Sequence, residues 1–289
     1  MATILVTGAN GQLGSELREQ APAHPQHRFV FYNRTGLDIT DPQKINACFA
    51  AHQPQYCINC AAYTAVDKAE TDRDSAYQTN ATAVKNLAAA CAQFHIRFIH
   101  ISTDYVFDGR GTMPYSETAA TNPSGVYGQS KLQGEHEALQ ANAETLIVRT
   151  SWVYSQYGHN FVETMLRLMQ SRTEIGVVAD QQGSPTYAAD LAEALLHIID
   201  SGIWQPGVFH FSNAGVVTWH GFAQAIKEAT GAACLIKPIT TAEYPTPAAR
   251  PAYSVLNTEK IQHVYGIRLK PWRESLLACL RKLGQAAHA

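Results

Sequence analysis

The chain has 289 residues, of which 46% are hydrophobic and 16% charged, with a formal net charge of -2. This length suits one large α/β domain with a smaller second portion, and the composition excludes a disordered chain. The near-neutral charge without a basic run argues against nucleic acid and against a membrane surface as partners. No stretch approaches the roughly 18 apolar residues of a membrane span. Because residues 2–8 lack the basic start of a signal peptide, we expect a cytoplasmic protein.

The cysteines and histidines do not indicate a metal centre. Cys57 and Cys60 form a C-x-x-C pair, which is redox-active in some proteins where it opens a helix. Here the pair lies at the end of an apolar, strand-like run, and we interpret both as buried, unreactive thiols. The twelve histidines show no metal-ligand spacing, so the sequence argues against a zinc site.

Short apolar runs alternate with helical patterns over the first half of the chain. The sequence predicts strands at residues 4–7, 28–32, 56–59, 98–102 and 145–149, and helices at 12–20, 42–52, 66–93 and 126–141. This alternation is typical of βαβ units, and the nearly continuous apolar strands are typical of sheets covered on both faces. We therefore predict an α/β fold with a Rossmann-like, doubly wound parallel sheet.

After about residue 150 the alternation is less regular. Helices are predicted at residues 160–170, 188–200, 220–230 and 272–283, strands at 174–178 and 207–212, and a proline-rich loop at 244–251. We predict an NAD(P)-binding domain in residues 1–150 and a smaller, partly interleaved substrate-binding portion in residues 151–289. Later segments of the second portion are expected to return to the first sheet.

A glycine-rich turn, Gly8-Ala9-Asn10-Gly11-Gln12-Leu13-Gly14, joins the first predicted strand to the first helix. In such turns one glycine allows the tight bend, one lets a pyrophosphate approach the backbone, and one lets helix pack on strand. The helix N-terminus adds free N–H groups and a positive dipole end. Glycines also serve ordinary turns, but this placement between strand and helix favours a dinucleotide cofactor.

The end of the second predicted strand bears on the choice of cofactor. An acidic residue there would bind the ribose 2′-hydroxyl of NAD. This chain has Tyr32-Asn33-Arg34 instead, and no carboxylate before Asp38. Arg34 can pair with a 2′-phosphate, which favours NADPH and leaves NADH possible. A solvated loop side chain is an equally good interpretation of Arg34.

A Y-x-x-x-K motif opens the helix predicted at residues 126–141. Its i, i+4 spacing puts Tyr127 and Lys131 on one helix face, where the ammonium is expected to lower the phenol pKa towards neutrality. Such a phenol is suited to donate a proton. Alone, the motif favours a chance pairing of a packed tyrosine and a solvated lysine. However, Ser102 and Thr103 end the fourth predicted strand, where open parallel sheets bind ligands, and their hydroxyls can bond a substrate carbonyl.

These motifs resemble the extended short-chain dehydrogenase/reductase family, whose signature is a G-x-x-G-x-x-G turn with a Ser/Thr–Tyr–Lys triad. Four blocks resemble one branch of it, the dTDP-4-dehydrorhamnose reductases: residues 59–70, 102–107, 149–154 and 250–258. The resemblance implies NAD(P)H-dependent reduction of the 4-keto group of dTDP-4-dehydro-L-rhamnose to dTDP-L-rhamnose. It places this step in deoxysugar and cell-surface polysaccharide biosynthesis, and it implies a homodimer.

The resemblance also implies residue roles. Tyr127 would protonate the substrate oxygen, Lys131 would hold the nicotinamide ribose, and Thr103 would align the carbonyl. Asp104 and Trp152 would contact the substrate together with Thr103, although core packing is the alternative for Trp152. The expected cofactor contacts are Gly8, Gly11, Gln12, Leu13, Gly14, Arg34, Asp38, Ile39, Ala62, Tyr63, Thr64, Tyr127 and Lys131.

Three further positions carry open alternatives. Arg250, in the proline-rich loop, is a candidate partner of the substrate diphosphate or a member of a structural salt bridge. Some members of the branch bind Mg²⁺ between subunits through glutamates. Glu16 matches one such position and Asp190 stands near a second, but we prefer a solvated surface side chain for Glu16. Asn80 is either a polar member of the site or a helix-capping residue.

Two other functions compete with a reductase. A sugar-nucleotide epimerase or dehydratase can share the fold, but dehydratases usually need an acidic pair beside the catalytic hydroxyl, and here Asp104 is followed by Tyr105. A non-catalytic NADP-binding regulatory subunit, similar to that of methionine adenosyltransferase, is the other alternative. The intact set of Thr103, Tyr127 and Lys131 favours an enzyme.

Overall fold

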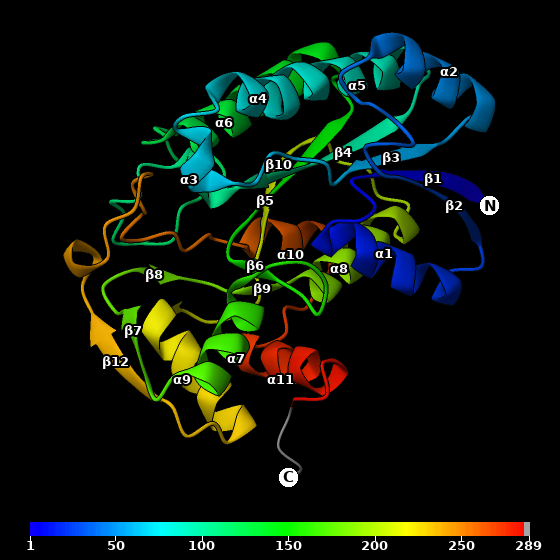
Figure 1. Cartoon of the computed structure of the whole chain (residues 1–289). Helices are drawn as coiled ribbons and strands as arrows, with labels where there is room; N and C mark the ends of the chain where they lie inside the picture. The colour runs from blue at the N-terminus through cyan, green and yellow to red at the C-terminus, as the bar shows by residue number, and fades with distance from the viewer. Residues whose placement is uncertain (286–289) are drawn as a thin grey trace.

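The computed structural model describes residues 1–285 (Figure 1). At its centre is a six-stranded sheet whose neighbouring strands are all parallel. The predicted doubly wound, Rossmann-like sheet is confirmed, because chain connections reverse direction between β1 and β3. The strands stand in the order β10 (Gly207–Phe211), β5 (Thr145–Thr150), β4 (Arg97–Thr103), β3 (Tyr56–Asn59), β1 (Ala2–Thr7) and β2 (His27–Tyr32).

Helices cover both faces of this sheet because successive side chains of a strand point to opposite faces. Leu5, Cys57 and Phe98 pack against one layer of helices, whereas Ile4 and Ile58 pack against the other. The first layer consists of α2 (Pro42–His52), α5 (Ala83–Gln93) and α6 (Val126–Ala141), and the second of α1 (Gln12–Gln20), α8 (Ala188–Asp200) and α10 (Glu259–Tyr265). Nowhere in residues 1–285 is a helix both long and apolar enough to span a membrane.

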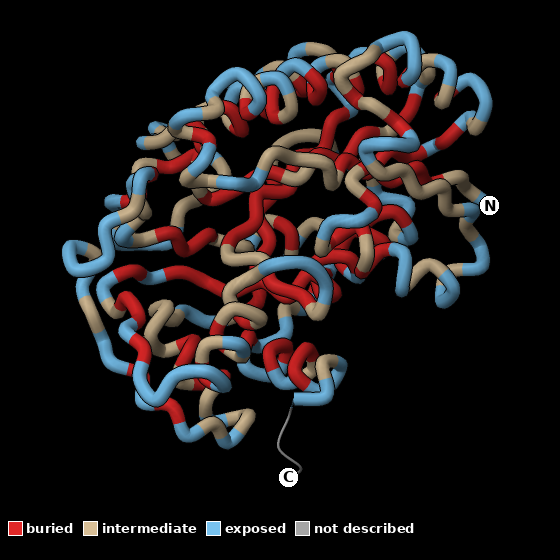
Figure 2. Tube along the Cα trace, in the orientation of Figure 1, coloured by how far each residue is buried: buried red, intermediate tan, exposed pale blue. Residues whose placement is uncertain are grey.

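A second, smaller group of elements forms the lower part of Figure 1 and has its own buried core around Phe222 and Trp272. In Figure 2 its buried segments lie inside an exposed outer surface. The sheet strand β10 and the helices α8 and α10 also come from beyond residue 150, so the division at that residue stays a prediction. The elements are β6 (Val153–Tyr154), α7 (Phe161–Ser171), β7 (Glu174–Val178), β8 (Gln182–Gly183), β9 (Thr186–Tyr187), β11 (Val217–Thr218), α9 (Trp219–Thr230), β12 (Leu235–Ile239) and α11 (Trp272–Lys282).

The single helix predicted over residues 66–93 is wrong. The segment consists of α3 (Val66–Ala69), a turn, α4 (Arg73–Tyr77), a π-helical turn (Gln78–Thr82) and α5. The π turn holds the buried Asn80, whose side-chain amide forms two hydrogen bonds with the backbone of Tyr63, in the segment after β3. The Tyr63 N–H donates to Asn80 Oδ1 at 2.8 Å, and Asn80 Nδ2 donates to the Tyr63 carbonyl oxygen at 3.1 Å. π-helical turns are rare and often occur at functional sites.

Candidate active site

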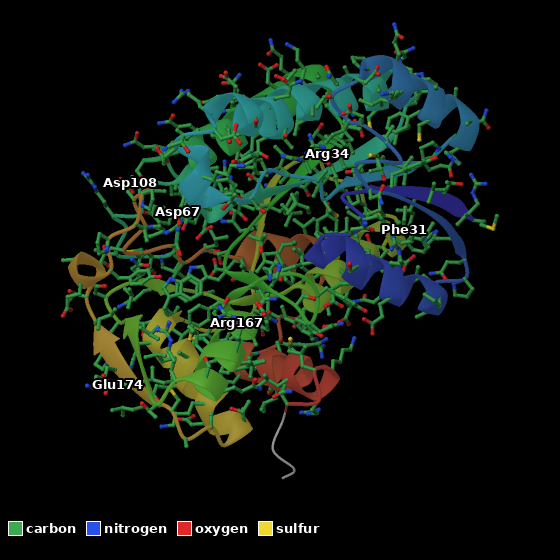
Figure 3. All side chains as sticks on the ribbon, viewed as in Figure 1. Phe31, Arg34, Asp67, Asp108, Arg167 and Glu174 are labelled. Atoms are coloured by element: carbon green, nitrogen blue, oxygen red, sulfur yellow. The ribbon has the colours of Figure 1, made fainter. Side chains whose placement is uncertain are left out.

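A cavity of about 840 Å³ opens where the strands β1 to β5 end. Parallel strands bring their carboxyl ends to one edge of the sheet, so segments far apart in sequence meet there. Fifteen of the residues expected at the site line this cavity, whereas Gly14 and Arg250 do not. Arg34, labelled in Figure 3, lies at its edge after β2. The fifteen are Gly8, Gly11, Gln12, Leu13, Arg34, Asp38, Ile39, Ala62, Tyr63, Thr64, Thr103, Asp104, Tyr127, Lys131 and Trp152.

The glycine turn is shaped by close backbone contacts. Gly8 has φ +65°, and a Cβ there would come within 2.5 Å of the backbone nitrogen of Ala61, which follows the neighbouring strand β3. A Cβ at Gly14 would lie 2.4 Å from the Gly8 carbonyl oxygen, so Gly14 is needed for α1 to pack on the turn. No side chain caps α1, which leaves its first N–H groups facing the cavity. This cradle fits a diphosphate group.

The two candidate ribose-binding residues differ in how firmly they are held. The Asp38 carboxylate accepts hydrogen bonds from the Thr40 hydroxyl (2.7 Å) and the Thr40 backbone N–H (3.0 Å). These bonds hold the pKa of Asp38 below its usual value. Arg34 is exposed and lines the cavity. The site therefore offers a carboxylate held by hydrogen bonds and an exposed cation.

The hydroxyls of Thr103 and Tyr127 lie close together at the end of β4. Burial is the main reason that the pKa of Tyr127 is raised, the Asp104 carboxylate raises it further, and the Thr103 hydroxyl acts in the opposite direction. The expected lowering of this pKa by Lys131 is therefore wrong. A phenol with a raised pKa stays protonated at neutral pH, which is the state required of a proton donor.

Lys131 is almost completely buried, lines the cavity, and is held by contacts with β4. Its Nζ donates to the carbonyl oxygen of Ile101 at 2.7 Å and lies 3.3 Å from Nε2 of His100. Burial lowers the pKa of Lys131 to about 8, whereas Glu135 on the same helix raises it. An amine with this pKa is still mostly protonated at pH 7, and its uncharged fraction grows as pH rises through about 8.

Ser102, the second hydroxyl considered at the end of β4, already has a buried partner. Its Oγ donates to Oε1 of Glu135 at 2.5 Å, and the same carboxylate binds Arg149 through both oxygens at 2.9 and 2.6 Å. The hydroxyl of Ser102 therefore belongs to a structural ion pair between β5 and α6. Thr103 is the hydroxyl that faces the phenol.

Asp104 presents an oxygen that lacks a partner. Its Oδ1 accepts the Thr103 hydroxyl at 2.9 Å, but Oδ2 has no hydrogen bond within the described part of the chain. Burial raises the pKa of Asp104 to about 6, against the lowering effect of the Thr103 and Ser254 hydroxyls. Asp104 lines the cavity, and its Oδ2 is a buried acceptor without a partner.

Trp152 forms a wall of the cavity and is not a core residue. Its φ of +49° is unusual for a large side chain and marks a strained backbone. Its indole stacks face to face on Trp219 at a centroid distance of 3.5 Å, and its Nε1 donates to Ser254 at 3.2 Å. On the other side a Cβ at Gly183 would lie 2.4 Å from the indole, so only glycine fits there. Sequence reasoning missed Trp219, Gly183 and Ser254 because no local motif marks them.

Glu16 is not the solvated surface residue that the sequence suggested, because it is fully buried. Its carboxylate accepts hydrogen bonds from Ser155 (2.6 Å) and Gln156 (3.3 Å), and burial raises its pKa. Asp190 is bound by Asn213, Ser275 and Lys270. No group of three or more metal-ligating side chains occurs in residues 1–285. The residues present therefore do not fit a magnesium site.

Comparison with known proteins identifies the family. The family model described as "RmlD substrate binding domain" matches residues 1–285. The chain belongs to this family. It is 41% identical to the spore coat polysaccharide biosynthesis protein SpsK of Bacillus subtilis, and the match covers 99% of both chains. A crystal structure of a dTDP-4-dehydrorhamnose reductase from Clostridium acetobutylicum is 41% identical, has a TM-score of 0.94, and is matched over 98% of this chain and 99% of its own.

One similar structure also bears on the cofactor. The dTDP-4-dehydrorhamnose reductase of Bacillus anthracis, solved in complex with NADP, is 38% identical with a TM-score of 0.92, over 97% of this chain and 99% of the other. Together with the glycine cradle and the cavity beside it, this supports a nicotinamide cofactor for the family member described here. The resemblance drawn from the four sequence blocks is thus confirmed.

Proposed function

We propose that this protein reduces the 4-keto group of dTDP-4-dehydro-L-rhamnose to dTDP-L-rhamnose with NADPH, with NADH as a possible substitute. The observation that carries the proposal is the meeting of Thr103, Tyr127 and Lys131 with the glycine turn in a single cavity. Relatives named dTDP-4-dehydrorhamnose reductase, at about 41% identity over nearly the whole chain, support the choice of substrate. Rhamnose supply for cell-surface polysaccharide is the corresponding biological role.

The bound nicotinamide cofactor supplies the hydride. The turn at Gly8 and Gly11 holds the diphosphate by its N–H groups, and Arg34 pairs with the 2′-phosphate. Lys131 bonds the nicotinamide ribose and Thr103 aligns the carbonyl of the sugar. In the reduction, carbon 4 of the sugar gains the hydride and its oxygen gains a proton, so two electrons and two hydrogens are added.

Tyr127 is the group proposed to deliver that proton. Its raised pKa keeps the phenol protonated until a stronger base appears beside it, and an alkoxide oxygen is such a base. Asp104, with its unpartnered Oδ2, is suited to accept a hydroxyl of the sugar. Trp152 gives the apolar wall against which a sugar ring packs.

The direct test combines the purified protein with NADPH and dTDP-4-dehydro-L-rhamnose. The proposal expects loss of NADPH absorbance and stoichiometric formation of dTDP-L-rhamnose. An epimerase would interconvert sugar nucleotides without net consumption of NADPH, and a regulatory module would bind the cofactor without turnover. Either result would replace the reductase proposal with the corresponding alternative.

The assembly and location of the protein are part of the same proposal. We infer a homodimer from the resemblance to its branch, and analytical ultracentrifugation should then give twice the chain mass of 31.6 kDa. A cytoplasmic location is proposed because NADPH and nucleotide-activated sugars are cytoplasmic reactants. Fractionation of cells that produce the protein would test it.

A further inference from the structure

Four buried side chains form a chain of hydrogen-bond contacts across the sheet beneath the cavity. Thr7 Oγ1 donates to Asn59 Oδ1 at 2.6 Å, and Asn59 Nδ2 lies 3.1 Å from Nδ1 of His100. Nε2 of His100 then lies 3.3 Å from Nζ of Lys131. Thr7 directly precedes Gly8, so the chain runs from the glycine turn through β1, β3 and β4 to the lysine on α6.

The orientation of the Asn59 amide is fixed by its neighbours. The backbone N–H of Ala61 donates to Asn59 Oδ1 at 3.2 Å, and an N–H can only donate. The atom facing Ala61 and Thr7 is therefore the amide oxygen, and the amide nitrogen faces His100. Because that nitrogen donates, Nδ1 of His100 must accept and carries no hydrogen.

His100 is uncharged in this environment. It is fully buried, and burial is the main cause that lowers its pKa well below the usual value; an ammonium on Lys131 lowers this pKa further. A neutral imidazole with a bare Nδ1 carries its hydrogen on Nε2. That N–H faces Nζ of Lys131, and two donors cannot bond to each other. An uncharged amine, in contrast, has a lone pair that can accept it, while one of its hydrogens goes to the Ile101 carbonyl oxygen.

We propose that His100 is a positioning residue, whose Nε2–H donates to the Lys131 amine when that amine is uncharged and so holds Lys131 in place. The orientation of the imidazole is in turn set by Asn59 and Thr7. For its effect on turnover the inference rests on the proposed function, whereas the tautomer of His100 does not depend on it. The imidazole of His100 thus links Asn59 at the end of β3, through Nδ1, to Lys131 on α6, through Nε2.

The other titratable groups around Lys131 do not explain an uncharged amine. Glu135, one turn later on α6, favours the ammonium, although its carboxylate is held by Arg149 of β5. Tyr127 lies one turn earlier on the same helix and keeps its proton, and Asp104 acts on Tyr127. Burial is the main cause of the lowered pKa of Lys131, and the hydrogen donated by His100 favours the uncharged amine in addition.

The tautomer is tested by ¹⁵N NMR on the ligand-free wild-type protein labelled at histidine. The shifts of the two ring nitrogens distinguish a protonated from a bare nitrogen, and the signal of His100 is assigned by its loss in His100→Phe. We expect a protonated Nε2 and a bare Nδ1 at every pH between about 6 and 9. A protonated Nδ1, or a doubly protonated ring at pH 7, overturns the inference. This measurement uses no substrate, so it is separate from the test of the proposed function.

The effect on Lys131 is tested by the pH profile of NADPH oxidation. Gln at position 100 can turn its Oε1 towards Lys131 and accept from an ammonium, so His100→Gln should move the limb of the profile near pH 8 upward by about one unit. His100→Phe retains the ring that stacks on Phe98 but removes the donor, and should move the limb in the same direction. His136→Gln, at an exposed position of α6, is the matched control and should leave the profile unchanged.

The positioning role of His100 is overturned if both His100 variants fold like the wild-type protein, as judged by circular dichroism, and their pH profiles keep the limb near pH 8 in its wild-type position. If the variants do not fold, the tautomer of the wild-type protein decides the inference. Absence of turnover in the wild-type protein would count against the proposed function and leave the NMR result to decide the assignment for His100.

Discussion

The guanidinium of Arg250 and the carboxylate of Asp67 form an ion pair of 2.5 Å that joins the proline-rich loop to α3. The two residues are 183 positions apart, and Asp67 is labelled on the left of Figure 3. Arg250 also donates to the hydroxyl of Tyr105 at 3.2 Å, and Tyr105 lines the cavity. The pair therefore connects the two parts of the chain directly beside the candidate site.

This geometry allows the two interpretations of Arg250 to be separated. If Arg250 releases Asp67 to bind the substrate diphosphate, Arg250→Ala should raise KM for the sugar nucleotide about tenfold. Asp67→Asn should then raise KM less than threefold, since it removes only the resting partner. Both variants should lose about 1 kcal/mol or less of stability, because both side chains are partly exposed. Equal KM values for the two variants would support the structural salt bridge instead.

Arg34 is expected to set the preference between the two nicotinamide cofactors. We predict that the wild-type protein uses NADPH at least as well as NADH, measured as kcat/KM. Arg34→Ala should lower kcat/KM for NADPH by about tenfold and leave the value for NADH within about twofold, because NADH has no 2′-phosphate. A tenfold preference of the wild-type protein for NADH would contradict this assignment, as would an equal loss with both cofactors.

Asp104 should make the stability of the fold depend on pH. Its pKa is raised to about 6 in the folded protein, compared with 3.8 for an ordinary aspartate. Between these values the unfolded chain has lost the proton and the folded protein keeps it, so stability falls as pH rises from about 4 to 6. The difference of about two units corresponds to roughly 3 kcal/mol. Asp104→Asn removes this titration and should gain stability relative to wild type between pH 4 and pH 7.5, measured by urea unfolding.

Asp108, labelled in Figure 3, provides a control of opposite sign. The backbone N–H of Arg110 is the first of the donors that lower the pKa of Asp108. Its carboxylate therefore stabilises the fold above the pKa of an unfolded aspartate, and this contribution is lost as pH falls. Asp108→Asn should lose stability relative to wild type at pH 7.5 and less at pH 4. If the stabilities of Asp104→Asn and Asp108→Asn changed with pH in the same direction relative to wild type, the changes would not come from the titration of these carboxylates.

The features that sequence reasoning found depend on local patterns and on one property of parallel sheets. The turn from Gly8 to Gly14 follows a strand directly, and Thr103 ends another. Since parallel strands end at the same edge, their meeting with Tyr127 could be inferred without coordinates. The helix predicted over residues 66–93 is interrupted twice, and the second interruption, the π turn, holds the bond between Asn80 and Tyr63, which no periodicity records.

Protonation states and aromatic contacts were outside the reach of sequence reasoning. The spacing of Tyr127 and Lys131 is correct for a shared helix face, but burial decides the pKa of each, and burial depends on elements packed from elsewhere. The same holds for Glu16, which a helical pattern placed at the surface and which the β6–α7 segment covers. Trp152 stacks on Trp219 with a positive φ at the turn that follows β5.

That stack leads to a prediction for Trp219. Without the second indole, the strained backbone at Trp152 should relax and the wall of the cavity should shift. Trp219→Leu should therefore raise KM for the sugar nucleotide about tenfold and leave the dissociation constant of NADPH within about twofold. Trp219→Phe retains a stacking ring and should recover most of the loss. Equal losses in cofactor and substrate binding would show that the variant merely unfolds the second part of the chain.

The proton donor is tested with three substitutions in the candidate triad. Tyr127→Phe removes one oxygen and retains the ring that packs edge-on against Tyr105, so turnover should fall by ~10²–10⁴ while NADPH affinity stays within a few-fold. Lys131→Met should be at least as damaging, because it removes the proposed ribose contact and the partner of His100. Thr103→Val should cost less if this hydroxyl only aligns the carbonyl.

Each triad variant needs two measurements, cofactor binding by fluorescence titration and hydride transfer by loss of NADPH absorbance. A true loss of proton donation lowers kcat and kcat/KM together, because the interaction exists only in the transition state. It should also leave the folded state intact, since the Tyr127 hydroxyl faces the cavity rather than the core. If Tyr127→Phe turned over the sugar nucleotide as fast as wild type, another group would have to protonate the oxygen. Asp104, with its pKa of about 6 and its free Oδ2, would be the first candidate.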